Sequence, residues 1–288
     1  MWRSKRIENA GIAESHSFSA YLKPKSALFC VNIVTEDDFR QTYRCQSFAD
    51  KAIEKYSDLF PVRPSIELAE ICADLLTDGH IQTRRHYHSK RYVYVGYFAD
   101  DPGELGRFYK RVYDLFGVRG TIRKWGIRYN GASTGYILPN ATVARILTLC
   151  GVPAGDKATK MYSVPEWILR GPKSLKAAFL RRSFTCEGTV YYDTWKDVWR
   201  IRYTMYKTAE LNNNLRMYLG QLSEMLAEFD IGVAGPWNAD RYTRKRDHNK
   251  IIGLGIEVRP GSFSRFAERI GFELRYKNEL LQKACEAS

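Results

Sequence analysis

Residues 66–81 read Ile-Glu-Leu-Ala-Glu-Ile-Cys-Ala-Asp-Leu-Leu-Thr-Asp-Gly-His-Ile, and residues 175–190 read Leu-Lys-Ala-Ala-Phe-Leu-Arg-Arg-Ser-Phe-Thr-Cys-Glu-Gly-Thr-Val. Each stretch predicts an apolar helix that ends in one carboxylate, Asp78 or Glu187, followed by a glycine and the start of a strand. The helix macrodipole places partial negative charge at a helix C-terminus, so an acid there is unfavourable unless a cation compensates for it. Two such helix ends brought together would form a site that attracts divalent metal ions.

The same order of elements follows both acids, which indicates an internal repeat. After Asp78 the sequence predicts strands at 80–86, 91–98, 119–128 and 134–138, with helices running through 115–116 and over 140–150. After Glu187 it predicts strands at 189–193, 198–206, 232–242 and 250–258, with helices over 209–229 and 262–270. Both closing helices run into a glycine that is followed six residues later by a lysine, at Gly151 and Lys157 and at Gly271 and Lys277.

The pattern predicts an α+β fold of two pseudo-symmetric αββαββα repeats, preceded by an N-terminal extension. We expect the extension at 1–63, the first repeat at 64–152, a proline- and glycine-rich linker at 153–173 and the second repeat at 174–288. Within the extension, 27–34 predicts a strand and 48–60 an amphipathic helix.

Composition indicates the kind of partner. The 288 residues include 45 Lys and Arg against 32 Asp and Glu, which gives a net charge of +13, and 44% of the residues are apolar. A surplus of this size on a folded chain favours a polyanion, most often nucleic acid. A generally basic, soluble surface is the alternative.

The cysteines and the hydropathy pattern exclude two other classes. Six scattered cysteines without paired spacing argue against a zinc module. No window approaches the length of a membrane span, and Met1–Arg6 lacks the apolar run of a signal peptide. We therefore expect a soluble protein of a reducing compartment, the cytoplasm or wherever the host keeps its genome.

The two motif stretches resemble the LAGLIDADG homing endonucleases. Residues 71–79 are similar to the nine-residue motif of that family, and 179–188 to its second-repeat form. Residues 164–168, Val-Pro-Glu-Trp-Ile, are similar to a phrase found between the repeats of archaeal and intein-type members. The resemblance covers roughly Ser65 to Lys277. It implies that the sheets form a saddle in the DNA major groove, with the two motif helices packed together at its centre.

The resemblance implies a site-specific endonuclease that hydrolyses phosphodiester bonds of double-stranded DNA with a long recognition site. Its cofactor would be Mg²⁺, with Mn²⁺ as a substitute, and it would act as a monomer because one chain holds both motif copies. Asp78 and Glu187 match the metal-binding acids of the family, and the backbone carbonyls of Thr77 and Cys186 could add ligands. Lys124 and Lys250 are our candidates for basic residues that polarise water near the metal, with a simple phosphate contact as the alternative.

Outward-facing strand positions predict the residues that contact DNA. If Ile81 points into the core, alternation exposes Gln82, Arg84 and His86. In the second repeat Arg200, Arg202 and Thr204 show the same alternation. Arg and Gln can bond guanine and adenine edges bidentately. A dense basic turn is expected to hold phosphates, with Arg241, Arg244, Lys245 and Arg246 as the candidate contacts.

Arg182 departs from the family pattern. Ala69, Ala73 and Thr77 are spaced four apart, so the first helix offers small residues to its partner, whereas the second helix has Ala178, Arg182 and Cys186. Arg182 would tilt the helices apart, pair with Asp74 across them, or mark a catalytically weakened copy. The last alternative favours a second function on the same scaffold, an RNA maturase or a DNA-binding regulator.

Overall fold

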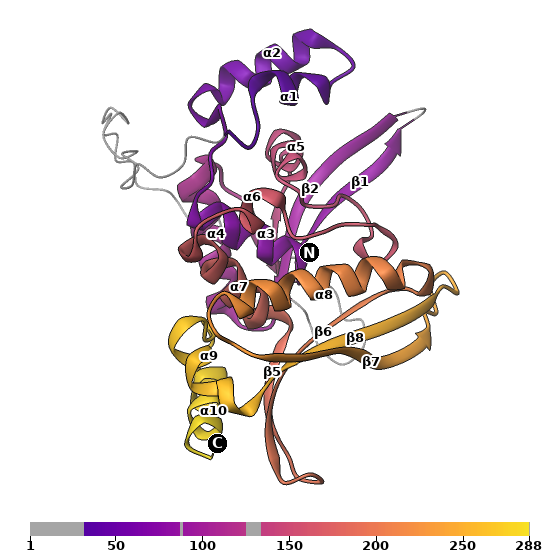
Figure 1. Cartoon of the computed structure of the whole chain (residues 1–288). Helices are drawn as coiled ribbons and strands as arrows, with labels where there is room; N and C mark the ends of the chain where they lie inside the picture. The colour runs from indigo at the N-terminus through magenta and orange to yellow at the C-terminus, as the bar shows by residue number, and fades with distance from the viewer. Residues whose placement is uncertain (1–31, 87–88, 125–133, 288) are drawn as a thin grey trace, which may run out of the picture. The chain divides into compact units, whose positions relative to one another are not determined.

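Two four-stranded antiparallel sheets with matching strand orders form the framework of the protein (Figure 1). The computed structural model describes residues 32–86, 89–124 and 134–287. The first sheet has the order β1-β2-β4-β3, with β1 at His80–His86, β2 at Ser89–Ala99, β3 at Thr121–Lys124 and β4 at Thr134–Leu138. The second has the order β5-β6-β8-β7, with β5 at Gly188–Asp193, β6 at Val198–Thr208, β7 at Val233–Thr243 and β8 at Lys250–Val258.

The helices follow the predicted order in both repeats. The first repeat contains α3 (Ile66–Leu76), α4 (Pro102–Phe116) and α5 (Ala141–Leu149). The second contains α7 (Lys173–Glu187), α8 (Asn212–Ala227) with the short turn η3 (Ala209–Leu211) before it, and α9 (Phe263–Arg269) after η4 (Pro260–Ser262). The expected α+β fold of two equivalent repeats is confirmed. A further helix, α10 (Arg275–Glu286), follows α9 and was not predicted.

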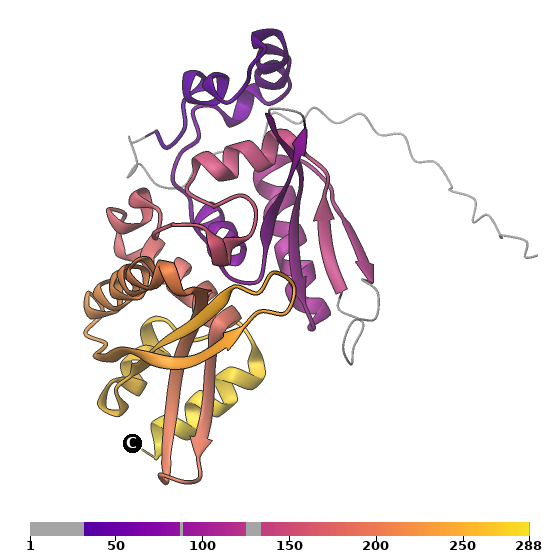
Figure 2. The same cartoon turned by 90° about the vertical axis from the view of Figure 1, so that its right-hand side faces the viewer.

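Each sheet has one face against helices, because apolar and polar residues alternate along its strands. Helices α4 and α5 contact the first sheet and α8 contacts the second, as Figures 1 and 2 show. On β6, Ile201 and Tyr203 are buried, whereas Arg200, Arg202 and Thr204 on the opposite face are partly exposed. The predicted inward direction of Ile81 on β1 is also confirmed, since it is fully buried.

The two motif helices, α3 and α7, pack against each other, and a tight connection joins each to the first strand of its repeat. A Cβ at Gly79 would lie 2.7 Å from Leu75 Cδ2 and 2.9 Å from the carbonyl oxygen of Gly96. A Cβ at Gly188 would lie 2.4 Å from the carbonyl oxygen of Phe184. The glycine after each acid is therefore required by close backbone approach, and it fixes where the carboxylate leaves the helix.

The segment between the repeats is built into the structure at several points. Ala154 forms a parallel bridge with Ile81, so the predicted linker extends the edge of the first sheet. It contains the turn η2 (Lys157–Thr159) and the short helix α6 (Glu166–Leu169). The Trp167 indole donates to the carbonyl of Cys150, 2.9 Å away, at the C-terminal end of α5. The phrase at 164–168 thus stabilises the end of the first repeat.

The described part of the N-terminal extension is helical. It contains α1 (Glu36–Gln41), α2 (Gln46–Lys55) and the turn η1 (Ser57–Leu59), so the predicted 48–60 helix breaks at Tyr56. Arg145 of α5 holds the extension by donating to the Thr42 carbonyl at 2.6 Å. Most of the strand expected at 27–34 lies outside the described residues, as do residues 125–128 of the third predicted strand.

In the described part of the chain, no helix is both long enough and apolar enough to cross a bilayer.

Candidate functional site

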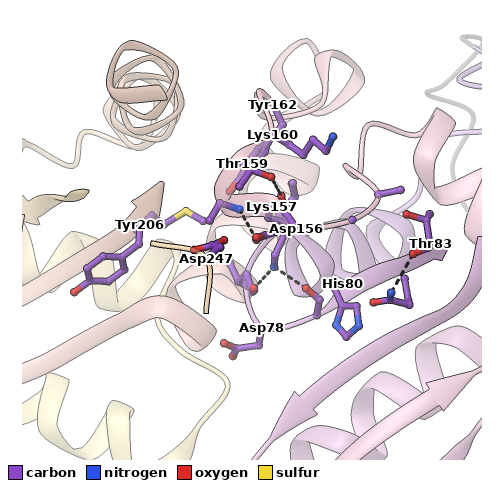
Figure 3. A pocket seen from close by; sticks show the side chains of 18 of the residues that line it. Asp78, His80, Thr83, Asp156, Lys157, Thr159, Lys160, Tyr162, Tyr206 and Asp247 are labelled. Carbon is purple, nitrogen blue, oxygen red and sulfur yellow. Dashed lines mark hydrogen bonds between the residues drawn. The ribbon is translucent and has the colours of Figure 1, made fainter. Parts of the chain in front are cut away.

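A cavity at the junction of the two repeats contains both predicted acids. Figure 3 shows this cavity from close by, with Asp78, His80, Asp156, Lys157 and Tyr162 among the labelled side chains. Its walls come from the end of α3, the start of β1, the segment between the repeats, the end of α7, the C-terminal part of β6 and the hairpin that joins β7 to β8.

Asp78 and Glu187 each directly precede the glycine at the C-terminal end of a motif helix; Glu187 is the last residue of α7, whereas α3 ends at Leu76, two residues before Asp78. Asp78 is exposed to solvent and Glu187 is partly buried. Burial, together with the negative charge of Asp78, raises the pKa of Glu187 to about 7. Two carboxylates in one cavity therefore oppose each other's ionisation, an effect that a bound divalent cation would cancel.

The donor set fits a hard cation that keeps additional oxygen ligands. Asp78 and Glu187 supply carboxylate oxygens, which Mg²⁺ prefers, and Mg²⁺ retains water or takes phosphate oxygens at its other positions. Among the described residues, no group of three or more His, Cys, Asp and Glu side chains could hold a metal ion by itself. The site is consistent with a metal that is completed by water and substrate.

Two lysines that the sequence analysis did not select as site residues support the helix ends. Lys157 Nζ donates to the backbone carbonyls of Leu75 at 3.0 Å and Gly79 at 2.6 Å, and also to that of Thr77. Lys277 Nζ donates to the carbonyls of Thr185 and Gly188, each at 2.6 Å. The shared offset of six residues after a glycine was the signal that could have identified this pair.

The lysines supply the cations that an acid at a helix C-terminus needs. Burial lowers the pKa of Lys157 to about 8, while the charges of Glu187 and Asp78 act in the opposite direction. Burial likewise lowers the pKa of Lys277. Lys157 lines the cavity. Its ammonium group therefore interacts with the charges of the two acids in addition to donating to the carbonyls.

The other predicted metal-site residues differ in their surroundings, and Thr77 lines the cavity together with the two acids. The Thr77 carbonyl, an expected ligand, already accepts a hydrogen bond from Lys157. The thiol of Cys186 lies 3.4 Å from Arg182 Nη2 and 3.7 Å from the Tyr97 hydroxyl. Lys124 and Lys250 are exposed at the end of β3 and the start of β8, and neither is among the described residues that line the cavity.

The predicted base contacts of the first repeat lie at the cavity rim. Gln82 and Arg84 line the cavity, and Arg84 is exposed. A register shift after Gln82 interrupts the pairing of β1 with β2, and the Gln82 amide donates to the Thr83 carbonyl at 3.0 Å. His86 ends β1, and its side chain lies outside the described part of the structure.

In the second repeat, the two arginines predicted to contact bases form ion pairs with neighbouring carboxylates. Arg200 pairs with Asp193 at 2.8 Å and with Glu257 at 2.7 Å, and Arg202 Nε pairs with Glu257 at 2.8 Å. Thr204 lies farther along the same face of β6. The open face therefore presents guanidinium groups held in fixed positions.

The predicted phosphate contacts lie on the β7–β8 hairpin, whose tip returns towards the cavity. Arg244 pairs with Asp156 of the segment between the repeats at 2.8 Å, and Arg246 also pairs with Asp156. Arg241 and Lys245 are exposed. Arg246 and Asp247 line the cavity, so this basic run borders the same space as the two acids.

Arg182 makes the cross-helix pair that was one of its three predicted alternatives. Its Nε bonds Asp74 Oδ1, and both side chains are completely buried. The arginine therefore lies within the contact between α3 and α7, one helical turn before Glu187.

Comparison with protein-family models gives no match. Among curated proteins, the chain is similar to the tRNA-splicing ligase RtcB of Methanopyrus kandleri, with 27% identity over 259 residues, 84% of this chain and 24% of that protein. RtcB of Pyrococcus abyssi is 34% identical over 130 residues, 45% of this chain and 13% of that protein. The replication factor C small subunit of Methanocaldococcus jannaschii is 22% identical over 155 residues, 53% of this chain and 8% of that protein. The chain thus spans about a quarter or less of the length of these relatives.

Similar solved structures include mesophilic variants of the homing endonuclease I-DmoI, at 13% identity and a TM-score of 0.47, covering 76% of this chain and 97% of that one. The homing endonuclease I-WcaI bound to its DNA recognition sequence has 12% identity and a TM-score of 0.46, with 78% and 91% covered. Full-length DUF199/WhiA from Thermatoga maritima has 10% identity and a TM-score of 0.41, with 78% and 62% covered.

Proposed function

We propose that this protein is a site-specific endonuclease of the LAGLIDADG type that cleaves double-stranded DNA with Mg²⁺, for which Mn²⁺ can substitute. The observation that carries the proposal is the placement of Asp78 and Glu187 in one cavity, at equivalent ends of the two packed motif helices. Both half-sites come from one chain, so we propose a monomer, active in the compartment that holds its DNA.

The residues of the chain have distinct tasks in this reaction. A divalent metal held by Asp78 and Glu187 would activate water and stabilise the charge that develops on the phosphate. Lys157 and Lys277 hold the helix ends that present the two acids. Lys157 also places positive charge beside the cavity, where it would favour the scissile phosphate and keep both acids ionised.

The two sheets are proposed to lie along the DNA major groove with their open faces towards the bases. Arg200, Arg202 and Thr204 would contact base edges in one half-site, and Gln82, Arg84 and His86 in the other. The carboxylates of Asp193 and Glu257 restrict the rotation of Arg200 and Arg202 before DNA binds, which lowers the entropy cost of binding. Lys124 and Lys250, together with the hairpin residues Arg241, Arg244, Lys245 and Arg246, would contact phosphates.

The curated relatives support an independent module. Proteins with names as different as a tRNA-splicing ligase and a replication factor C subunit each match this chain over a minor part of their own length. We infer that the shared segment is separate from the activities that those names describe. The ligase name does favour RNA as a second partner, so an RNA maturase, or a DNA-binding regulator, is the alternative function.

The test is cleavage of a randomised duplex DNA library with Mg²⁺ or Mn²⁺ by the wild-type chain and by Asp78→Asn and Glu187→Gln. We expect selective cutting by the wild type, no cutting by either variant, and retained DNA binding by both. Asp114→Asn, which changes an exposed aspartate of α4, is the matched control and should cut normally. Selective binding without cutting in either metal would contradict the proposal and favour the regulator, and selective binding of RNA would favour the maturase.

A further inference from the structure

Arg182 brings a full charge into the contact between the motif helices. The corresponding residue of α3, on the basis of the four-residue spacing, is Ala73, which is small and fully buried. Arg182 is also fully buried and is among the largest side chains buried in the protein. Because a buried charge costs several kcal/mol of solvation, its partners must be well placed.

Besides the thiol of Cys186 on its own helix, Arg182 has four partners that lie outside α7. Its Nε bonds Asp74 of α3, its Nη1 bonds Glu273 at 3.0 Å, and its Nη2 bonds the Tyr97 hydroxyl of β2 at 2.7 Å and also Glu104 of α4. Three of these four partners belong to the first repeat. The side chain of Arg182 therefore connects the second repeat to the first at the level of the helix contact.

A second arginine closes the network from the other side. Arg111 of α4 pairs with Asp74 Oδ2 at 3.2 Å and with Glu273 at 2.7 Å. Each oxygen of the Asp74 carboxylate thus accepts from a different repeat, Oδ1 from Arg182 and Oδ2 from Arg111. Glu273 accepts from the same two arginines, so four charged side chains form a closed ring.

The position of this ring relative to the acids indicates its purpose. Asp74 precedes Asp78 by one helical turn, and Arg182 precedes Glu187 by slightly more than one. A buried ion pair is usually no more stabilising than apolar side chains of the same size, whereas it specifies one geometry. Asp78 and Glu187 repel each other, so the two helix ends need a constraint that keeps them together when no metal is bound.

We propose that Arg182 and Asp74 form a positioning clamp that holds the ends of α3 and α7 at the separation at which Asp78 and Glu187 bind one set of divalent metals. The inference rests on the proposed function. Arg182 touches neither substrate nor metal in this role, so it acts through the two acids. It occupies a position of the helix contact at which α3 has the small residue Ala73.

The test uses the double variant Asp74→Ala/Arg182→Ala in the full chain. It removes one charge of each sign, and Glu104 keeps Arg107 while Glu273 keeps Arg111. The matched control is Lys176→Ala/Glu228→Ala, which removes an ion pair of 2.5 Å on the same helix α7, within the second repeat. We expect the clamp variant to need about tenfold more Mg²⁺ for half-maximal cleavage. Its DNA affinity should stay unchanged, and the control should show the wild-type Mg²⁺ midpoint.

An unchanged Mg²⁺ midpoint in the clamp variant, or an equal rise in both double variants, would overturn the clamp. A second measurement does not depend on cleavage. The urea midpoint of unfolding at pH 8 in EDTA is compared with and without Glu187→Gln. The glutamine should raise the midpoint in the wild-type background, because it removes the repulsion from Asp78, and should raise it less in the clamp variant, whose helix ends can separate. An equal rise of the urea midpoint in both backgrounds would overturn the clamp, whether or not the wild type cuts DNA. Failure of the wild type to cut DNA is a separate result, and it would overturn the endonuclease proposal.

Discussion

Lys157 donates a hydrogen bond to the backbone carbonyl of Gly79, 2.6 Å away and 78 residues earlier in the chain. Lys277 makes the equivalent bond to Gly188 in the second repeat, also at 2.6 Å. Each motif helix thus receives its terminal cation from a segment that follows the closing helix of its half, α5 or α9. The unfavourable charge of an acid at a helix C-terminus is offset by a lysine distant in sequence.

Replacing Lys277 with Met should destabilise the protein more than replacing an exposed lysine. The change leaves the carbonyls of Thr185 and Gly188 without their buried donor, and we expect a loss of about 1–3 kcal/mol in the free energy of unfolding. Urea denaturation measures this loss. Lys283→Met, at an exposed position of the same helix α10, is the control and should change little; equal losses in the two variants would refute the role assigned to Lys277.

Stability in the absence of metal should fall as the pH rises from about 4.5 to 7. The ordinary pKa of Glu187 is 4.5, and the folded state raises it to about 7. Between these values the folded state binds more protons than the unfolded state, so the free energy of unfolding decreases with rising pH. Above pH 7 the full penalty remains, and below pH 4.5 it disappears.

Glu187→Gln removes this titration, so in EDTA the variant should be more stable than the wild type at pH 8 by about 1–3 kcal/mol. The two proteins should be equally stable at pH 4. Thermal or urea unfolding at both pH values provides the comparison. A difference of the same size at both would show that burial and Asp78 do not control this carboxylate.

Lys124 and Lys250 should behave as phosphate contacts in DNA binding, since both are exposed on strands that border the open faces. Changing either one to Ala should weaken DNA binding for all sequences and lower the slope of affinity against salt by about one ion. The cleavage rate at saturating DNA should stay at the wild-type value. Lys110→Ala on α4 is the control; a fall in the saturated rate would instead support the alternative that these lysines polarise water.

Asp156→Ala should strengthen DNA binding. Asp156 pairs with Arg244 and Arg246, so it competes with phosphate for both guanidinium groups. Its removal should raise affinity about threefold and steepen the salt dependence. Asp58→Ala makes the same change in net charge at an exposed position of η1 and should have a smaller effect in a fluorescence anisotropy titration. Equal effects in the two variants would mean that net charge alone is responsible.

Much of the fold could be predicted from local patterns. Strand β6 alternates apolar and polar residues and strand β8 is largely apolar, so their type follows from periodicity. Because the sequence repeats, the elements predicted in one half of the chain could be compared with those predicted in the other half. Helix α10 was missed because few of its positions are apolar, with Leu281 and Ala284 as its buried nonpolar residues.

The two acids of the site could be predicted from the sequence, whereas the two lysines that bind the helix ends were not assigned to it. Glu187 is the last residue of α7 and Asp78 lies two residues beyond the end of α3, so local sequence was sufficient to place both acids close to the helix ends. Lys157 lies in a segment rich in proline and glycine, and its position depends on contacts such as the bridge of Ala154 with Ile81. Lys124 and Lys250 were selected by their positions along the strands. Strand positions do not reveal that the segment containing Lys157 lines the cavity. The pairing of Arg182 with Asp74 was within reach because both lie on the helices that were expected to touch.

The bridge between Ala154 and Ile81 also bears on how this protein could be divided. A first half that stopped at residue 152 would contain the motif helix and both hairpins but would lack the ammonium group that completes its helix end. A half that extended beyond Lys157 would include it, as the second half does with Lys277. The repeating structural unit therefore runs from the motif helix, α3 or α7, to the lysine that binds its end, Lys157 or Lys277. Engineered chimaeras built from these halves should exchange the chain downstream of the lysine, so that each half keeps the lysine that offsets the charge of its own acid.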